Sequence, residues 1–104
     1  PDGLANQTEG GIIQAASWAL KEAIQYDRSR ILTGSWSDYP ILTFEESPVV
    51  EVTIVTRPDQ PPLGAGEGTQ GPTVAAIANA IFNAMGARLR DMPFTRDRVL
   101  AALA

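Results

Sequence analysis

Residues 41–56, ILTFEESPVVEVTIVT, hold the strongest β-strand pattern in the chain. The pattern predicts two strands, one over about residues 41–44 and a second over about residues 49–56. In the second strand, aliphatic side chains alternate with other residues, as expected of a strand with one buried face. That face would carry Val50, Val52 and Ile54, while Glu51, Thr53 and Val55 would point to the other side. We therefore expect a small sheet near the middle of the sequence.

A long helix is expected before this stretch, over about residues 7–26. Asn6 and Glu9 have the spacing of a capping box, in which each side chain satisfies a free backbone N–H at the start of a helix. Gly10 and Gly11 weaken a helix, so we expect them to allow close approach of another backbone or of a ligand. The apolar positions at helical spacing predict a buried face made of Ile13, Ala16, Leu20 and Ile24.

Two further helices are expected after the strands. The first covers about residues 72–85, with Pro72 in its first turn and Gly86 as its C-terminal cap, and it would bury Val74, Ile77, Ile81 and Met85. A short helix over about 95–103 would be capped by Thr95. The expected fold class is therefore α/β (α+β), with two main helices packed on a small sheet in a single unit, residues 1–104.

The composition excludes several kinds of chemistry. The 104 residues contain no cysteine and no histidine, which removes disulfides, thiolate chemistry, imidazole bases and the usual zinc or haem ligands. The net charge is −4, and Lys21 is the only lysine, so we expect no nucleic-acid partner. No apolar run approaches the roughly 18 residues of a membrane span. The chain opens at Pro1 without an initiator methionine or a signal-peptide pattern, so we expect a processed or excised piece of a longer product.

The most unusual segment is glycine-rich, LGAGEGTQG over residues 63–71. Gly66, Gly68 and Gly71 match the G-x-G-x-x-G pattern of dinucleotide-binding folds, but that pattern requires the glycines to follow a strand directly. Here the proline-rich stretch RPDQPP (57–62) comes between, and Glu67 would repel a pyrophosphate. A dinucleotide-binding module is therefore the weakest of the functions considered.

Two polar positions are candidates for chemistry. Glu67 stands between two glycines, which let a ligand approach its carboxylate closely, so it is a candidate general base. The alternative for Glu67 is a solvated loop acid. The polar run Asn6–Glu9 includes Gln7, whose amide can bind the edge of a heterocycle, although helix capping explains Asn6 and Glu9 without any ligand.

Three stretches carry a family resemblance: NQTEGGIIQAASWALKEA (6–23), SWSDYPILTFEESPVVEVTIV (35–55) and PPLGAGEGTQGPTVAAIANAIFNAMGARLRDMPFTRDRV (61–99). They resemble the C-terminal end of molybdenum hydroxylase large subunits, the xanthine dehydrogenase and aldehyde oxidase family. Within it they are most similar to the branch of the isoquinoline 1-oxidoreductase beta subunits. The resemblance implies a C-terminal piece of a molybdopterin-binding domain. It also implies an oxidoreductase that hydroxylates N-heterocycles or aldehydes with oxygen derived from water.

The resemblance assigns roles to individual residues. It implies that Glu67 is the catalytic base and that Gln7, Gly66 and Gly68 contact the cofactor. The metal would be held by molybdopterin, often as its cytosine dinucleotide, so no residue of this chain is expected to be a metal ligand. The implied partners are the remainder of the large subunit and an iron–sulfur domain or subunit that carries electrons away.

Several expectations concern the chain by itself. Without the rest of the pocket we expect it to bind no cofactor and to be catalytically inert, and we expect exposed apolar surface to favour a homodimer. The alternative function is a stand-alone, non-catalytic binding or assembly module of the same fold. The substrate stays open, and so does the choice between a bacterial cytoplasm and periplasm.

Overall fold

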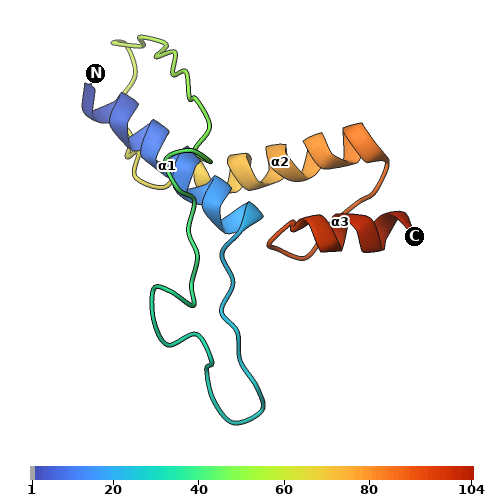
Figure 1. The fold of residues 1–104 in the computed structure, drawn as a ribbon. Helices are drawn as coiled ribbons and strands as arrows, with labels where there is room; N and C mark the ends of the chain where they lie inside the picture. Colours follow the sequence, from blue (N-terminus) through green and yellow to red (C-terminus); the bar gives the residue numbers. More distant parts are fainter. Residues whose placement is uncertain (1) are drawn as a thin grey trace.

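The computed structural model describes residues 2–104, so Pro1 of the expected 1–104 unit lies outside the described residues. Three helices occur in the order α1 (Asp2–Leu20), α2 (Gln70–Met85) and α3 (Arg96–Leu103). Helices α1 and α2 pack on each other, and the long connection between them forms one loop below α1 and an arch above it (Figure 1). The N-terminal end of α1 and the C-terminal end of α3 lie at opposite sides of the molecule (Figure 1).

Residues 2–104 contain no sheet, so the α/β (α+β) prediction is wrong. Throughout residues 2–104 the β pairing is limited to one isolated antiparallel bridge between Tyr26 and Ile31. The first expected strand, 41–44, runs into a turn in which Thr43 O accepts from the N–H groups of Glu46 and Ser47, at 3.1 and 3.0 Å. The second, 49–56, has no ladder. A strand pattern records side-chain alternation, whereas a sheet also requires a second extended segment alongside, and the described chain does not supply one.

Helix α1 begins and ends earlier than the expected 7–26. Thr8 Oγ1 donates to Leu4 O at 2.8 Å, a bond typical of a helix interior, so Asn6 and Glu9 lie within α1 and form no capping box. At the other end, Phe94 N donates to Ala19 O at 2.6 Å. Ala19 is among the last four residues of α1, whose carbonyls have no partner within the helix, so a residue distant in sequence satisfies this one.

The ends of the two later helices follow local sequence signals. Gly86 has φ 73°, and its N–H donates to Phe82 O at 2.8 Å, which confirms it as the cap of α2. Thr95 Oγ1 accepts from Arg98 N at 3.4 Å, which confirms the cap of α3. Pro72 lies in the first turn of α2, as expected.

The core is small and is built from small side chains. Its buried hydrophobic residues are Ala15, Ala16, Ala19, Ala87 and Phe94. The expected apolar face of the first helix is therefore wrong in part, since Leu20 is 40% exposed and Ile24 is 54% exposed. On the second helix Met85 is likewise exposed, whereas Val74, Ile77 and Ile81 are half-buried. The small face of α1 is buried because α2 approaches closely: a Cβ on Gly11 would clash with the side-chain hydroxyl of Thr69.

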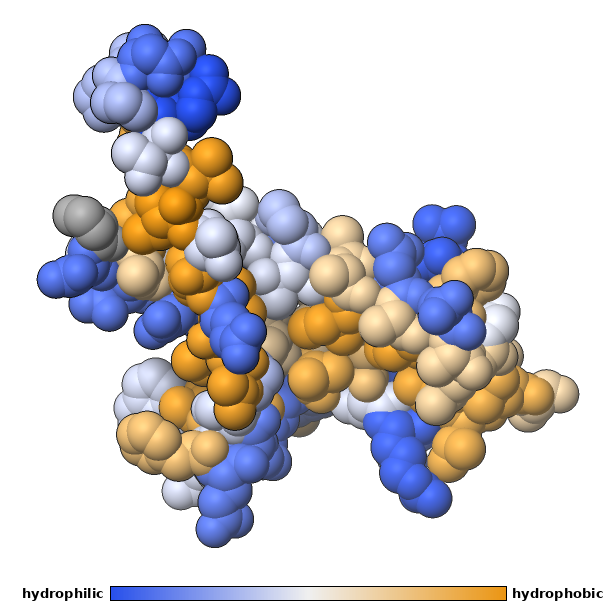
Figure 2. Space-filling model, turned by 90° about the horizontal axis from the view of Figure 1, so that it is seen from above, coloured by the Kyte–Doolittle hydropathy of each residue, from blue (hydrophilic) through white to orange (hydrophobic). Residues whose placement is uncertain are grey.

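The molecule is open in shape. Its radius of gyration is 16.6 Å, whereas a compact domain of this length has about 13 Å. Its accessible surface is 8073 Å², against about 5,700 Å² for a compact monomer of the same mass. Hydrophobic residues are spread over the visible face (Figure 2). Within residues 2–104, none of the helices combines the length and apolar composition needed to cross a bilayer.

Candidate functional site

The structure brings two of the sequence-predicted site residues together. Gln7 lies on α1, and Gly66 lies in the glycine-rich loop that leads into α2. The amide Nε2 of Gln7 is 4.0 Å from the position that a Cβ would occupy on Gly66, so a side chain added there would just reach the amide. Folding therefore places the polar start of the first helix against the loop that contains Glu67.

A second contact fixes the same loop one helical turn further along α1. Gln7 and Gly11 are four residues apart, so they share a face of the helix. Thr69 packs against Gly11, and its carbonyl accepts from the N–H and the hydroxyl of Thr73, at 3.0 and 2.7 Å. The loop thus follows α1 from Gln7 to Gly11 and then enters α2.

Glu67 lies between these two contacts. Its side chain is exposed, and its backbone carbonyl accepts from Gln70 N at 3.4 Å, which closes the turn before α2. A Cβ on Gly68 would meet no atom within 4 Å, so the space on that side of Glu67 is open. The turn thus holds an exposed carboxylate with glycine on either side, next to Gly66, the residue of this loop that lies near Gln7.

The site is a surface and not a cavity. None of the five best-formed cavities in the described part of the chain is lined by Gln7, Gly66 or Glu67, and all three residues are exposed. No cluster of three or more His, Cys, Asp or Glu side chains that could hold a metal ion occurs within residues 2–104. A ligand on this surface would therefore contact only one wall of its binding site in this chain.

Sequence reasoning missed Thr69. Its hydroxyl is buried and has no hydrogen-bond partner within the described residues, and it stands at the N-cap of α2 without forming a cap hydrogen bond. A threonine immediately before a helix that carries proline in its first turn is a recognisable signal for the N-cap. The contact with Gly11, however, depends on the crossing of two helices.

A groove of about 620 Å³ was also missed. Trp18 and Phe94 contribute to its wall, together with residues of α2 and of the segment that follows. Arg88 at its edge donates to Asn79 Oδ1 at 2.7 Å and lies 4.1 Å from the centre of the Phe82 ring. Both interactions hold the Arg88 guanidinium against α2. They therefore stabilise the segment after α2 in a position where it runs back along that helix.

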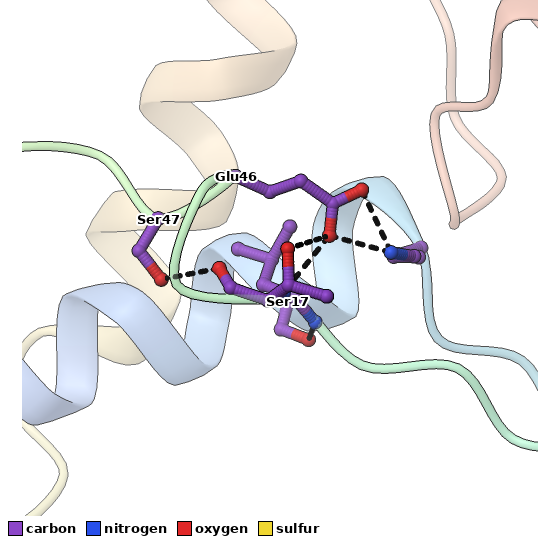
Figure 3. A network of polar contacts seen from close by, with 6 residues as sticks. Ser17, Glu46 and Ser47 are labelled. Carbon is purple, nitrogen blue, oxygen red and sulfur yellow. Dashed lines mark hydrogen bonds and ion pairs between the residues drawn. The ribbon is translucent and has the colours of Figure 1, made fainter.

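A polar network attaches the middle of the chain to the end of α1 (Figure 3). Lys21 Nζ donates to both carboxylate oxygens of Glu46, at 2.7 and 2.6 Å, and Thr43 donates to Glu46 through its N–H and its hydroxyl. Ser17 Oγ accepts from Leu42 N at 3.0 Å. The hydrogen bond from Lys21 and those from Thr43 lower the pKa of Glu46 to about 2. This network holds a loop in place, and it contains none of the predicted site residues.

Comparison with known proteins identifies the family. A model of the molybdopterin cofactor-binding domain matches residues 1–48. One chain of the nicotinate dehydrogenase of Pseudomonas putida is 46% identical over 103 residues, which cover 99% of this chain and 9% of that protein. This chain belongs to the molybdenum hydroxylase family. The beta subunit of isoquinoline 1-oxidoreductase from Brevundimonas diminuta is a further relative, 36% identical over 89% of this chain and 12% of its own length.

The fold of this chain also matches a solved structure. Cu,Mo-CO dehydrogenase in its carbon monoxide reduced state superimposes with a TM-score of 0.79 and 26% identity, over 98% of this chain and 14% of that one. The chain therefore spans only about a tenth of the length of the relatives it matches. Its open shape recurs within a much longer protein.

Proposed function

We propose that this chain forms part of the active-site wall of a longer, molybdopterin-dependent oxidoreductase subunit that hydroxylates N-heterocycles or aldehydes. The observation that carries the proposal is the proximity of Gln7 to Gly66, which brings two separate polar motifs near each other beside Glu67. The names of the relatives, a nicotinate dehydrogenase and an isoquinoline oxidoreductase, support an N-heterocyclic substrate.

The residues on this surface fit a pterin. The side chain of Gln7 offers both a donor and an acceptor, which match the alternating donors and acceptors on the edge of a heterocycle. Gly66 has no side chain on the side that faces Gln7, so a planar ring can lie close to the backbone. We therefore assign Gln7, Gly66 and Gly68 to cofactor contact. The metal would be bound through the cofactor, and we propose the cytosine dinucleotide form.

Glu67 is the proposed general base. When bound, the cofactor supplies the two-electron redox chemistry and the oxygen that is transferred. A carboxylate within about 3 Å of the reacting hydroxyl can accept its proton, and the glycines beside Glu67 leave room for that approach. After turnover, Glu67 would release the proton to water, and electrons would leave through an iron–sulfur domain or subunit.

One wall of a site is not sufficient for catalysis. Gln7, Gly66 and Glu67 lie on an open surface, so the opposite walls would come from the remainder of the subunit. We therefore propose that the isolated 104 residues are inert, and turnover or stoichiometric molybdenum in that material would refute this. The alternative is a stand-alone binding module. It predicts that, in material from the native host, peptides of this chain are found only in a protein of about 11 kDa, and that this protein carries no molybdenum.

The test is Glu67→Gln in the complete enzyme, with activity and molybdenum content measured together. Loss of a general base lowers turnover by about 10²- to 10⁴-fold, and we expect the molybdenum content to stay unchanged. Glu45→Gln, which changes an exposed carboxylate in another loop, is the matched control and should leave turnover as it is. Gln7→Ala should instead reduce the molybdenum content. Wild-type turnover in the Glu67 variant would contradict the base assignment.

A further inference from the structure

The arch above α1 contains an extended segment whose backbone has no partner (Figure 1). In residues 48–56, PVVEVTIVT, no backbone N–H or carbonyl forms a hydrogen bond with any other residue that the structure describes. The segment is rich in β-branched residues, which favour strands, and it is bounded by a turn before it and the proline-rich stretch after it. It therefore has the composition and the limits of a strand that lacks only its neighbour.

The exposure of its side chains alternates with a period of two. Val50 and Val52 are half-buried and Ile54 is 39% exposed, whereas Val49 is 94% exposed and Val55 is 76% exposed. This is the alternation of a strand with one face toward a protein interior. The segment therefore shows the two-faced exposure pattern of a strand although it has no ladder.

The amount of exposed surface favours an extensive covering partner. The chain exposes about 2,400 Å² more than a compact monomer of its mass, well above the roughly 800 Å² that each partner buries in an interface of standard size. The relatives whose sequences match are much longer, since this chain spans 9% to 15% of them. The polypeptide that covers this surface is therefore available within one subunit.

We propose that residues 48–56 form a β-strand by pairing with an extended segment of the same longer subunit, outside these 104 residues. The partner would contribute main-chain hydrogen bonds and its own alternating apolar residues, on the face shared with Val50 and Val52. We rest this inference on the part of the proposed function that places the chain in a longer subunit, and not on the role of Glu67.

The first test is amide hydrogen exchange, measured on the isolated 104 residues and on the complete subunit. In dilute isolated chain, we expect the amides of 49–56 to exchange at the rate of unprotected backbone. In the complete subunit, we expect at least alternate amides to slow by about 100-fold or more. Equally fast exchange in both samples would overturn the proposal. Slowing that depends on protein concentration would overturn it too, because the partner would then be a second copy.

Proline substitutions provide a second test. Consecutive backbone N–H groups of a strand point to opposite edges, so Thr53→Pro and Ile54→Pro each remove a donor from a different edge. At least one should give the complete subunit a lower thermal midpoint than its matched control, Thr53→Ala or Ile54→Ala. None of the four should alter the helix content of the isolated chain, since the segment lies outside its helices.

The two proposals fail in different ways. If neither proline variant differs from its alanine control and the subunit is active, strand pairing is wrong while the proposed function stands. If material from the native host contains this chain only as a protein of about 11 kDa without molybdenum, the proposed function fails. The strand proposal then fails with it, because no longer subunit would supply the partner segment.

Discussion

Gly11 illustrates how a single missing methyl group sets the distance between helices. The α1–α2 contact forms at this residue, where the hydroxyl of Thr69 occupies the space that a side chain would need. Gly10, its neighbour, has nothing within 4 Å of its Cβ position. Packing therefore requires glycine at position 11 but not at position 10.

Substitution separates the two glycines. Gly10→Ala should stabilise the chain by about 1 kcal/mol, because alanine favours a helix over glycine. Gly11→Ala should destabilise it by about 1–3 kcal/mol, the usual cost of overpacking. Thermal unfolding followed by circular dichroism measures both.

The same contact allows a double-mutant control. Adding Thr69→Ala to Gly11→Ala removes the clashing oxygen and leaves the Thr69 Cβ position at ordinary contact distance, 3.6 Å, so most of the lost stability should return. Thr69→Val keeps an atom in the clashing position and should not restore it. Equal stability of the two double variants would show that the helix crossing does not depend on this contact.

At the scale of elements, the loop that follows the bridge at Tyr26 and Ile31 is held to α1 by charge and hydrogen bonds. Glu46 accepts from Lys21 at the end of the helix and from Thr43 in its own turn (Figure 3). Ser17 accepts from Leu42 beside them. The loop thus has a defined position although the described residues form no sheet that could hold it.

This attachment should weaken in acid. The pKa of Glu46 falls from 4.5 to about 2 on folding, chiefly through its hydrogen bond from Lys21, so the unfolded chain takes up the proton first as the pH decreases. The stabilisation by Glu46 is therefore complete above about pH 4.5 and is lost as the pH falls toward 2. In Glu46→Gln, the thermal midpoint should lie below wild type at pH 6, and the gap should close by pH 2.

The control for this pH dependence is Glu45→Gln, the adjacent exposed carboxylate, which forms no side-chain hydrogen bond within the described residues. The difference in thermal midpoint between this variant and wild type should not change between pH 6 and pH 2 as it does for Glu46→Gln. A gap between wild type and Glu46→Gln that stays constant from pH 6 to pH 2 would show that ionisation of Glu46 is not the cause.

At the scale of the whole molecule, exposed apolar surface dominates. Phe44, Val49 and Leu63 are each at least 91% exposed, and the five buried apolar residues include four alanines. Helix α2 contains no charged residue in its 16 positions, yet none of its residues is fully buried. A helix of that composition is normally covered on several sides.

We therefore expect the isolated 104 residues to associate with themselves. Light scattering during size exclusion should give a mass above the 11.1 kDa of one chain, and the mass should rise with concentration. The complete subunit, in which the same surface would be covered, should not show this behaviour at equal molar concentration. A constant mass of 11 kDa for the isolated chain would contradict self-association.

Local sequence signals determined part of this fold correctly. Gly86 and Thr95 mark the end of α2 and the start of α3, because a left-handed glycine and a capping hydroxyl act within one helical turn. The motifs around Gln7 and Glu67 were also recognisable, since they lie in short, unusual runs and resemble a known family. What those two side chains do remains a prediction.

Only the tertiary structure decided the rest. Helix α1 ends at Leu20 although the apolar pattern continues to Tyr26, and the N–H of Phe94, distant in sequence, donates to the free carbonyl of Ala19 in its last turn. The segment 49–56 has a strand pattern without a sheet, because pairing requires a neighbour that is not among the described residues. Gln7 lies near Gly66, and Gly11 lies against Thr69, because the loop that leads into α2 runs beside α1. Each of these outcomes depends on contacts between distant segments, which periodicity and capping do not encode.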